Sequence, residues 1–394
     1  MVSVKEAKRL IELWSKKPES IRVNLYEATN LVLAEDIYSS IDSPPFNQSA
    51  VDGYAFKFSK GILKSGLTID GEVTAGDSPN IGTKTGTACR IFTGAQVPEG
   101  FDTIVMQECT EISGATIFIR DKNCRKGMNI RLMGSQIKKG ALAIKSGTKI
   151  SPGVAGFLSG IGVSKVKVTR PPRISIIGTG NELIVPGKTL TPGKVFESNT
   201  YSLNAALAAS GIRPIAIHHT KDTMSEIIKA INNCLKKSDL LILSGGVSVG
   251  DYDFVAEALH YCGVKCIFHG VKQKPGKPMY FGVKERAMVF GLPGNPAASL
   301  TCFYEYILPT LMRLMGNRVM NGKEKLFMSE SYKKKPGFTY FLKGKSIGNT
   351  VHILDAQQSY IMSSFAMANC IIQLDENRTI FKKGEPVEIQ YLHH

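Results

Sequence analysis

Residues 239–253 read DLLILSGGVSVGDYD, and this stretch decides the fold of the central part of the chain. The apolar run 240–243 is typical of a buried strand, and the glycines that follow it precede a predicted helix. Backbone N–H groups of such a turn and the positive end of the helix can bind an anion. The loop with Gly245, Gly246 and Ser248 is therefore a candidate anion site.

Strands and helices alternate on both sides of this stretch. Strands are predicted at 173–178, 214–218, 239–244, 265–268, 279–282 and 287–291, and helices at 198–209, 222–236, from about 253, and 295–315. Asp222 is expected to cap its helix, and Ser3 is expected to cap another at the start of the chain. Alternation of this kind predicts an open, mainly parallel α/β sheet with helices on both faces. Ligands of such sheets bind at the carboxyl ends of the strands.

The rest of the 394-residue chain divides into further domains. The motif RPPR at 170–173 marks a boundary, short strands with glycine turns fill 62–150, and the last segment ends in the alternating pattern EPVEIQYLHH. We expect a multidomain α/β plus β protein, whose last domain is a small barrel or sandwich. The predicted domains are an N-terminal helical and linker domain (1–45 with 145–172), a β-rich domain (46–144), the α/β domain (173–318) and a C-terminal β-barrel (319–394).

The amino-acid composition limits the possible functions. The 49 basic against 33 acidic residues give a formal charge of +16, which favours anionic partners, although a generally basic proteome explains it equally well. No basic helix or zinc finger indicates nucleic-acid binding, and no apolar run is long enough to span a membrane. The eight cysteines form no C-x-x-C pair and predict reduced thiols in a cytoplasmic protein.

Three more loops follow predicted strands. GTGNEL (178–183) brings the carboxylate of Glu182, KQKPGKP (272–278) holds three lysines on a stiff loop, and GLPGNP (291–296) leads into a helix. Each loop taken alone could be a structural turn or a solvated charged loop. Asp251 and Asp253 would repel a phosphate unless a divalent cation lay between the carboxylates and the phosphate. Asp253 could also simply cap its helix.

Five motifs in this order resemble the molybdopterin molybdenumtransferase family, which includes MoeA proteins and the gephyrin E domain. They are SPPFNQSAVDGYAF (43–56), RIFTGA (90–95), SGGVSVGDYD (244–253), KPGKP (274–278) and GLPGNP (291–296). The resemblance implies a molybdopterin-binding α/β domain and an elongated, four-domain homodimer with its site at the subunit interface. It also implies a reaction in which adenylylated molybdopterin and molybdate give molybdenum cofactor and AMP, with a divalent metal expected to be Mg²⁺.

The resemblance also implies roles for individual residues. Expected catalytic residues are Asp52, Glu182, Asp222 and Asp253, and the last three are expected to hold the metal. Expected substrate-binding residues are Thr93, Gly245, Gly246, Ser248, Lys274, Lys277, Pro293, Asn295, Pro296 and Ser359. The chain departs from the family pattern at Asn181, where an acid is common, at Ala298, where a serine is common, and at Lys343, where an arginine is common.

Two other functions share parts of this pattern. A receptor scaffold, as in the gephyrin relative, would be supported by a fused adenylyltransferase domain or a long linker, which this sequence lacks. Molybdopterin adenylyltransferases share the α/β domain, but their glycine loop normally reads GGTG where this chain reads GGVS. Molybdopterin adenylyltransferase and molybdoenzyme apoproteins are expected as transient partners, and nucleic acid and membranes are not.

Overall fold

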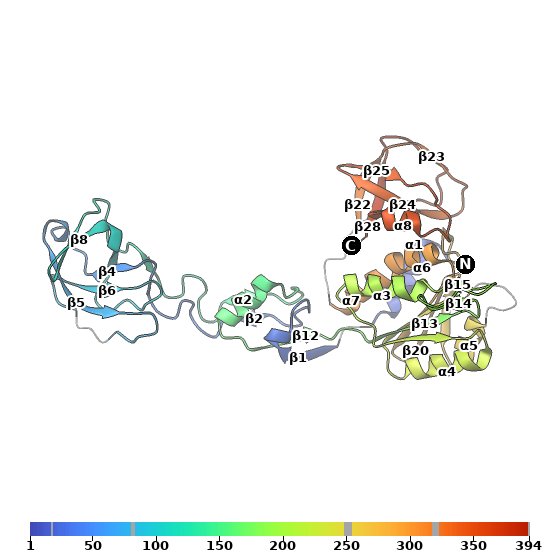
Figure 1. Cartoon of the computed structure of the whole chain (residues 1–394), viewed down its shortest axis with the longest axis horizontal. Helices are drawn as coiled ribbons and strands as arrows, with labels where there is room; N and C mark the ends of the chain where they lie inside the picture. Colours follow the sequence, from blue (N-terminus) through green and yellow to red (C-terminus); the bar gives the residue numbers. More distant parts are fainter. Residues whose placement is uncertain (17–18, 80–82, 248–253, 317–322, 393–394) are drawn as a thin grey trace. The chain divides into compact units, whose positions relative to one another are not determined.

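The computed structural model describes residues 1–16, 19–79, 83–247, 254–316 and 323–392. Ser248 and Asp253, two of the predicted site residues, lie outside these ranges. The chain forms two compact units, which are described separately (Figure 1). The first comprises Met1–Ile21, Asn30–Ala34 and Val168–His394, and the second comprises Arg22–Thr29 and Glu35–Lys167.

A six-stranded sheet is the centre of the first unit. Its strands, in spatial order, are β16 (Ala216–Thr220), β13 (Ile174–Thr179), β17 (Leu240–Ser244), β21 (Ala287–Leu292), β20 (Tyr280–Lys284) and β18 (Lys265–His269). The first four are parallel, which confirms the prediction, whereas β20 pairs antiparallel with β21 and β18 pairs antiparallel with β20. Only the two residues Glu285 and Arg286 connect β20 to β21, and a connection this short can join only antiparallel strands.

Helices cover both faces of this sheet, as predicted (Figure 1). Ile176 and Ile242 point to one face, against α1 (Val4–Trp14), α3 (Asn199–Ala209) and α6 (Pro296–Cys302). Ile177 and Leu243 point to the other, against α4 (Met224–Leu235) and α5 (Val255–Tyr261). Because both faces are buried, the strands read as continuous apolar runs in the sequence.

The helix predicted at 295–315 is interrupted. A π-helical turn, η4 (Phe303–Ile307), separates α6 from α7 (Leu308–Leu314). The N–H of Leu308 donates to the carbonyl of Phe303, five residues earlier, and Pro309, which has no N–H, follows at once. A π turn shifts the hydrogen-bond register at the point where the proline would otherwise break it.

The C-terminal part of the first unit is a closed barrel, which confirms the predicted β-barrel. Its five strands are β24 (Thr339–Ile347), β25 (Thr350–Ile353), β22 (Lys323–Met328), β28 (Pro386–Tyr391) and β26 (Cys370–Leu374), and β26 closes onto β24. Val351, Ile372, Val387 and Ile389 fill the interior. Strand β19 (Gln273–Lys274), which begins the lysine loop, adds to β24. Smaller elements are β14 (Leu183–Ile184), β15 (Val195–Phe196), β23 (Tyr332–Lys333), α8 (Ser363–Met367) and β27 (Ile380–Phe381).

The second unit is β-rich, as predicted. Its main sheet has the order β7 (Thr103–Met106), β4 (Gly53–Phe56), β6 (Thr87–Ile91), β5 (Leu67–Val73), β9 (Thr116–Ile119) and β8 (Thr110–Ser113). Minor elements are η1 (Leu25–Glu27), β2 (Ile37–Tyr38), β3 (Gln48–Ser49), η2 (Ile62–Lys64), η3 (Gln107–Cys109), β10 (Ile130–Arg131), β11 (Leu142–Ile144) and α2 (Pro152–Gly160). Strands β1 (Ser20–Asn24) and β12 (Lys165–Thr169) pair with each other. The finer domain bounds given above stay a prediction.

The two predicted helix caps have different outcomes. Ser3 accepts a hydrogen bond from the N–H of Glu6, as a side-chain cap does, which confirms that prediction. Asp222 does not cap α4, because Thr223 occupies that position and makes no side-chain bond there, so that prediction is wrong.

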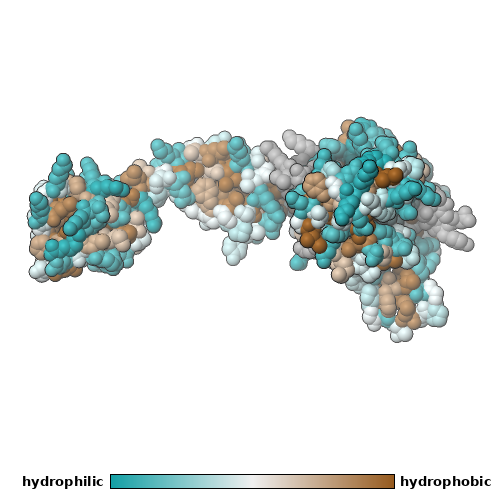
Figure 2. Space-filling model, turned by 90° about the horizontal axis from the view of Figure 1, so that it is seen from above, coloured by the Kyte–Doolittle hydropathy of each residue, from teal (hydrophilic) through white to brown (hydrophobic). Residues whose placement is uncertain are grey.

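The eight cysteines are all free, as the sequence predicts. None of the helices in the described ranges is long and apolar enough to cross a membrane. On the face drawn in Figure 2, hydrophobic residues lie among hydrophilic ones on both units.

Candidate functional site

The carboxyl ends of three neighbouring strands bring the glycine loops together. Gly245 and Gly246 follow β17 with φ values of +98° and +62°, a region that L side chains rarely adopt. A Cβ on Gly245 would lie 2.5 Å from the carbonyl oxygen of Thr179, which ends β13. The two glycines therefore allow the loop after β17 to pass directly against the end of β13.

Asn199, at the start of α3, ties two of these loops. Its Nδ2 donates to Ser244 Oγ and to the carbonyl of Gly294, both at 2.8 Å. The sequence did not indicate this role of Asn199, because its partners come from distant segments.

Three buried polar atoms at this edge have no hydrogen-bond partner: Thr179 Oγ1, Asn199 Oδ1 and Asp222 Oδ1. A buried polar atom left unpaired costs about 1–3 kcal/mol. Such atoms are expected where a ligand or an ion completes the hydrogen bonding. The N–H of Asp222 donates to Asn181 Oδ1 at 3.2 Å, so the asparagine that replaces the family's acid holds the segment that carries Asp222.

A cavity of about 500 Å³ lies at this end of β13 and β16. Its lining includes Asn181, Lys194, Glu197, His219 and Lys221. Glu182, which follows Asn181 in the chain, is exposed. Among the residues that the structure describes, no three His, Cys, Asp or Glu side chains group as a metal centre, and Asp253 lies outside them.

A second cavity, of about 570 Å³, separates the lysine loop from the C-terminal barrel. Predicted residues Lys274, Lys277, Pro293, Asn295 and Ser359 all line it. The tyrosines at 332, 340 and 360 form its aromatic wall, and Lys274 Nζ lies 5.4 Å from the ring centre of Tyr340. Sequence reasoning missed these tyrosines, because no motif contains them.

The lysine loop rests on a buried glutamine. Gln273 Nε2 donates to the carbonyl of Gly276 at 3.1 Å, and the hydroxyl of Tyr306 donates to Gln273 Oε1. A Cβ on Gly276 would lie 2.6 Å from Cys302 Sγ. This tight support limits the freedom of Lys274 and Lys277, which are themselves exposed.

Ser359 is docked on the start of α6. Its hydroxyl accepts from Asn295 Nδ2 at 2.9 Å, and its carbonyl accepts from the N–H groups of Ala297 and Ala298 at 3.0 and 3.3 Å. These two N–H groups, in the first turn of the helix that Pro296 begins, therefore hold the Ser359 segment. Ser299, the nearest serine after the motif, is fully buried.

In the second unit, the predicted residues Asp52 and Thr93 lie together. The N–H and the hydroxyl of Thr93 donate to Asp52 Oδ1 at 2.7 and 2.8 Å. These two hydrogen bonds lower the pKa of the Asp52 carboxyl below its usual value. Asp52 is therefore an ionised, pre-oriented carboxylate at neutral pH.

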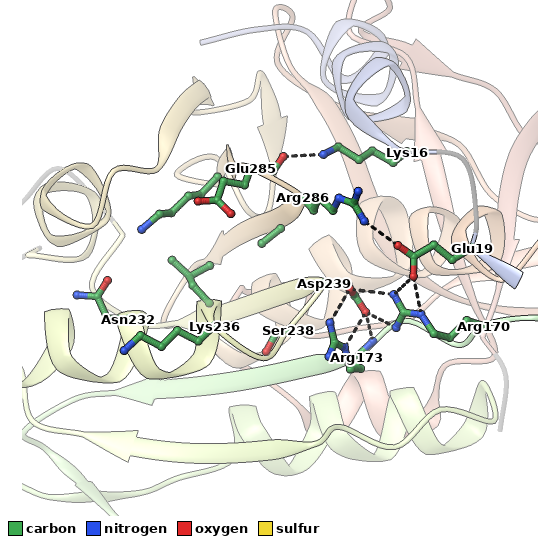
Figure 3. Close-up of a pocket in the computed structure, with 13 residues that line it drawn as sticks. Lys16, Glu19, Arg170, Arg173, Asn232, Lys236, Ser238, Asp239, Glu285 and Arg286 are labelled. Atoms are coloured by element: carbon green, nitrogen blue, oxygen red, sulfur yellow. Dashed lines mark hydrogen bonds and ion pairs between the residues drawn. The ribbon is translucent and has the colours of Figure 1, made fainter. Parts of the chain in front are cut away.

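A third cavity, of about 730 Å³, lies at the opposite, amino edge of the sheet (Figure 3). Asp239, before β17, accepts from both terminal nitrogens of Arg170 at 2.8 and 3.1 Å and from the N–H of Arg173 at 2.7 Å. Glu19 accepts from Arg170 and Arg286, both at 3.0 Å. The acids here are bonded to the chain's own arginines, which is the pattern of a structural ion-pair network.

Fold and loops together define an α/β protein with glycine-rich loops at the carboxyl ends of its strands and a C-terminal barrel. Three family models match: MoeA N-terminal region (domain I and II) at 2–162, probable molybdopterin binding domain at 175–313, and MoeA C-terminal region (domain IV) at 325–392. The chain belongs to the molybdopterin molybdenumtransferase (MoeA) family, whose curated members are named as transferases.

Relatives match over almost the full length. The molybdopterin molybdenumtransferase of Haemophilus influenzae is 32% identical over 379 residues, covering 94% of each chain. That of Staphylococcus epidermidis is 33% identical over 398 residues, covering 98% of this chain and 95% of the relative. The crystal structure of a molybdopterin biosynthesis MoeA protein from Pyrococcus horikoshii has a TM-score of 0.85 at 29% identity and covers both chains completely.

Proposed function

We propose that this protein inserts molybdate into adenylylated molybdopterin and releases AMP, as the last steps of molybdenum cofactor assembly. One observation carries the proposal beyond family membership. The lysine loop and the Ser359 segment, 85 residues apart (274 to 359), line one cavity of about 570 Å³. That volume is typical of sites for small organic ligands and exceeds what a tetrahedral oxyanion alone would fill.

The chain's own groups suit the charges of this reaction. Molybdate is a dianion, and Lys274 and Lys277 offer two ammonium groups on a loop with restricted freedom. Cleavage of the adenylate's pyrophosphate link leaves negative charge on AMP and on the pterin phosphate. Cations and N–H groups that are fixed before the reaction stabilise such charge without reorganising. The tyrosine wall offers apolar surface for the pterin end of the substrate.

We propose Mg²⁺ as the metal. Magnesium takes one or two carboxylates, keeps several waters and binds substrate phosphates, so it needs no cluster of three protein acids. The orphaned Oδ1 of Asp222 fits this chemistry, and Glu182 and Asp253 are the other acids that would hold the ion. When bound, the metal would offset phosphate charge.

Three further expectations belong to the proposal. The active form is a homodimer, the protein works in the cytoplasm, and molybdopterin adenylyltransferase or molybdoenzyme apoproteins bind it transiently. Asp52 and Thr93 enter the proposal through the family resemblance and their mutual hydrogen bonds. Light scattering of the purified protein tests the dimer directly.

The central test is AMP release. The purified protein is incubated with adenylylated molybdopterin, Mg²⁺ and molybdate, and AMP is quantified against a reaction without protein. We expect molybdate-dependent AMP release, reduced about 100-fold by Lys274→Ala, since a charge-assisted contact contributes about 1.5–3 kcal/mol. Lys272→Ala is the matched control, because Lys272 is exposed on the same loop but does not line the cavity. Absence of AMP release by the folded wild-type protein would overturn the proposal.

A further inference from the structure

Lys343 stands where the family often has an arginine, and its ammonium is enclosed by main-chain carbonyls. The residue lies on β24 and is 4% exposed. Its Nζ donates to the carbonyls of Ala356, Ile361 and Gln358 at 2.8, 3.0 and 3.3 Å. An ammonium has three donors, and all three are used by these carbonyls.

The three carbonyls belong to the segment 355–362, which carries Ser359. A second tie crosses the same segment: Gln357 Nε2 donates to the carbonyl of Lys343 at 2.8 Å, and the N–H of Lys343 donates back to Gln357 Oε1 at 2.9 Å. Ser364 Oγ donates to the carbonyl of Ala356 at 2.9 Å. Ala356 itself has a φ of +57°, which a non-glycine residue keeps only when its surroundings hold it there.

Ser359 lies between two of the carbonyls that Lys343 holds, those of Gln358 and Ile361. Ser359 itself accepts hydrogen bonds from Asn295 and from the first N–H groups of α6. Lys343 therefore holds the main chain on either side of Ser359, and the start of α6 holds Ser359 itself. Movement of the ammonium would shift Ser359 relative to the lysine loop across the cavity.

We propose that Lys343 is a positioning residue for Ser359 and does not bind the oxyanion itself, an inference that rests on the proposed function. The cationic groups that meet the oxyanion are then Lys274 and Lys277. Burial lowers the pKa of Lys343, whereas the three hydrogen bonds to carbonyls favour its protonated form. A guanidinium cannot replace it, because its donors diverge in a planar fork and cannot converge on three carbonyls around one atom.

The two roles make opposite predictions for Lys343→Arg. If Lys343 positions the segment, we expect Lys343→Arg and Lys343→Met both to raise the KM for molybdate about tenfold with kcat within about threefold, the effect of losing bonds to a charged group. If Lys343 binds the oxyanion, the arginine variant would bind molybdate as well as wild type or better. That outcome would overturn the proposal.

Hydrogen exchange gives a readout that does not depend on turnover. The amides of Ala297 and Ala298 donate to the carbonyl of Ser359, so they should lose protection in Lys343→Met while amides of the barrel strands, such as that of Ile372, keep theirs. Unchanged protection at 297 and 298 would overturn the positioning role. If wild type releases no AMP, the proposed function fails, while exchange still tests the role of Lys343.

A milder variant is needed in case Lys343→Met fails to fold. Ser364→Ala removes one bond to the Ala356 carbonyl, carries no charge change and does not line the cavity. We expect a rise in the molybdate KM of about threefold and partial loss of protection at Ala297 and Ala298. Wild-type values for both measurements would count against the proposal.

Discussion

The two edges of the central sheet carry similar residues but use them differently. At the amino edge, Arg173 and Asp239 directly precede neighbouring parallel strands, and Asp239 is bonded to Arg170 and Arg173 around a cavity of about 730 Å³ (Figure 3). At the carboxyl edge, the two cavities described above have volumes of about 500 and 570 Å³, and Thr179, Asn199 and Asp222 each leave a buried oxygen without a partner.

This difference indicates that buried polar groups without hydrogen-bond partners locate a binding site better than cavity volume does. Acids that already accept several hydrogen bonds have little left to offer a ligand, and their burial is offset within the protein. Unpaired buried atoms cost stability, and a bound ligand or ion is one way in which their hydrogen bonding is completed. We therefore propose that the ion pairs of the amino edge stabilise the fold and that the carboxyl edge binds the ligand.

The largest expected effect is on Asp222. Asp222→Asn removes the carboxylate whose Oδ1 is unpaired, so we expect AMP release to fall at least about 100-fold, as loss of a transition-state contact does. Thermal unfolding should stay near wild type, because the N–H bond from Asp222 to Asn181 does not involve the changed atom. Near-normal turnover with excess Mg²⁺ would remove Asp222 from the site.

The converse change tests the amino edge. Asp239→Asn weakens the bonds from Arg170 and Arg173, so we expect the free energy of unfolding to fall by about 2 kcal/mol while kcat for AMP release stays within about twofold. Urea denaturation and the AMP assay measure the two quantities. A loss of turnover without loss of stability would break the comparison between the two edges.

The pH dependence of stability tests the same carboxylate. Burial alone would raise the pKa of Asp239, but the hydrogen bonds from Arg170 and Arg173 outweigh it and lower the pKa to about 2 from the usual 3.8. Since the folded-state pKa is the lower one, the ionised carboxylate contributes about 2 kcal/mol above pH 4, and this is lost as pH falls toward 2. The stability gap between wild type and Asp239→Asn should therefore narrow between pH 5 and pH 2. A constant gap would show that the carboxylate's charge is not responsible.

The smallest effect is expected beneath the lysine loop. Tyr306→Phe removes the hydroxyl that donates to Gln273, which in turn bonds Gly276. We expect about 1 kcal/mol less stability and a molybdate KM about threefold higher, because the loop that carries Lys274 and Lys277 loses part of its support. Steady-state kinetics over a range of molybdate concentrations measure the shift.

The matched control for this change is Tyr304→Phe. Tyr304 is also buried, and its ring stacks on Phe365. We expect its molybdate KM to stay at the wild-type value, because the ring that packs is retained. An equal rise in KM in both variants would show that the support through Gln273 is not the cause.

Much of the fold could be predicted because it rests on local patterns. The apolar runs at Ile174–Thr179 and Leu240–Ser244 are strands, Ser3 caps the first helix, and Val387 and Ile389 fill the barrel as their alternation indicates. The glycine and proline motifs also located the turns that follow β13, β17 and β21, because turn conformation depends on adjacent residues.

The sequence by itself therefore determined the elements, the loops and the family. Only the tertiary structure decided which groups meet. The antiparallel pairing of β20 with β18, the binding of Ala297 and Ala298 to Ser359 and the enclosure of Lys343 all depend on partners elsewhere in the chain. The physical reason is that periodicity and turn chemistry act over a few residues, whereas hydrogen bonding in a buried site is settled by whichever distant donor or acceptor packing brings within about 3 Å.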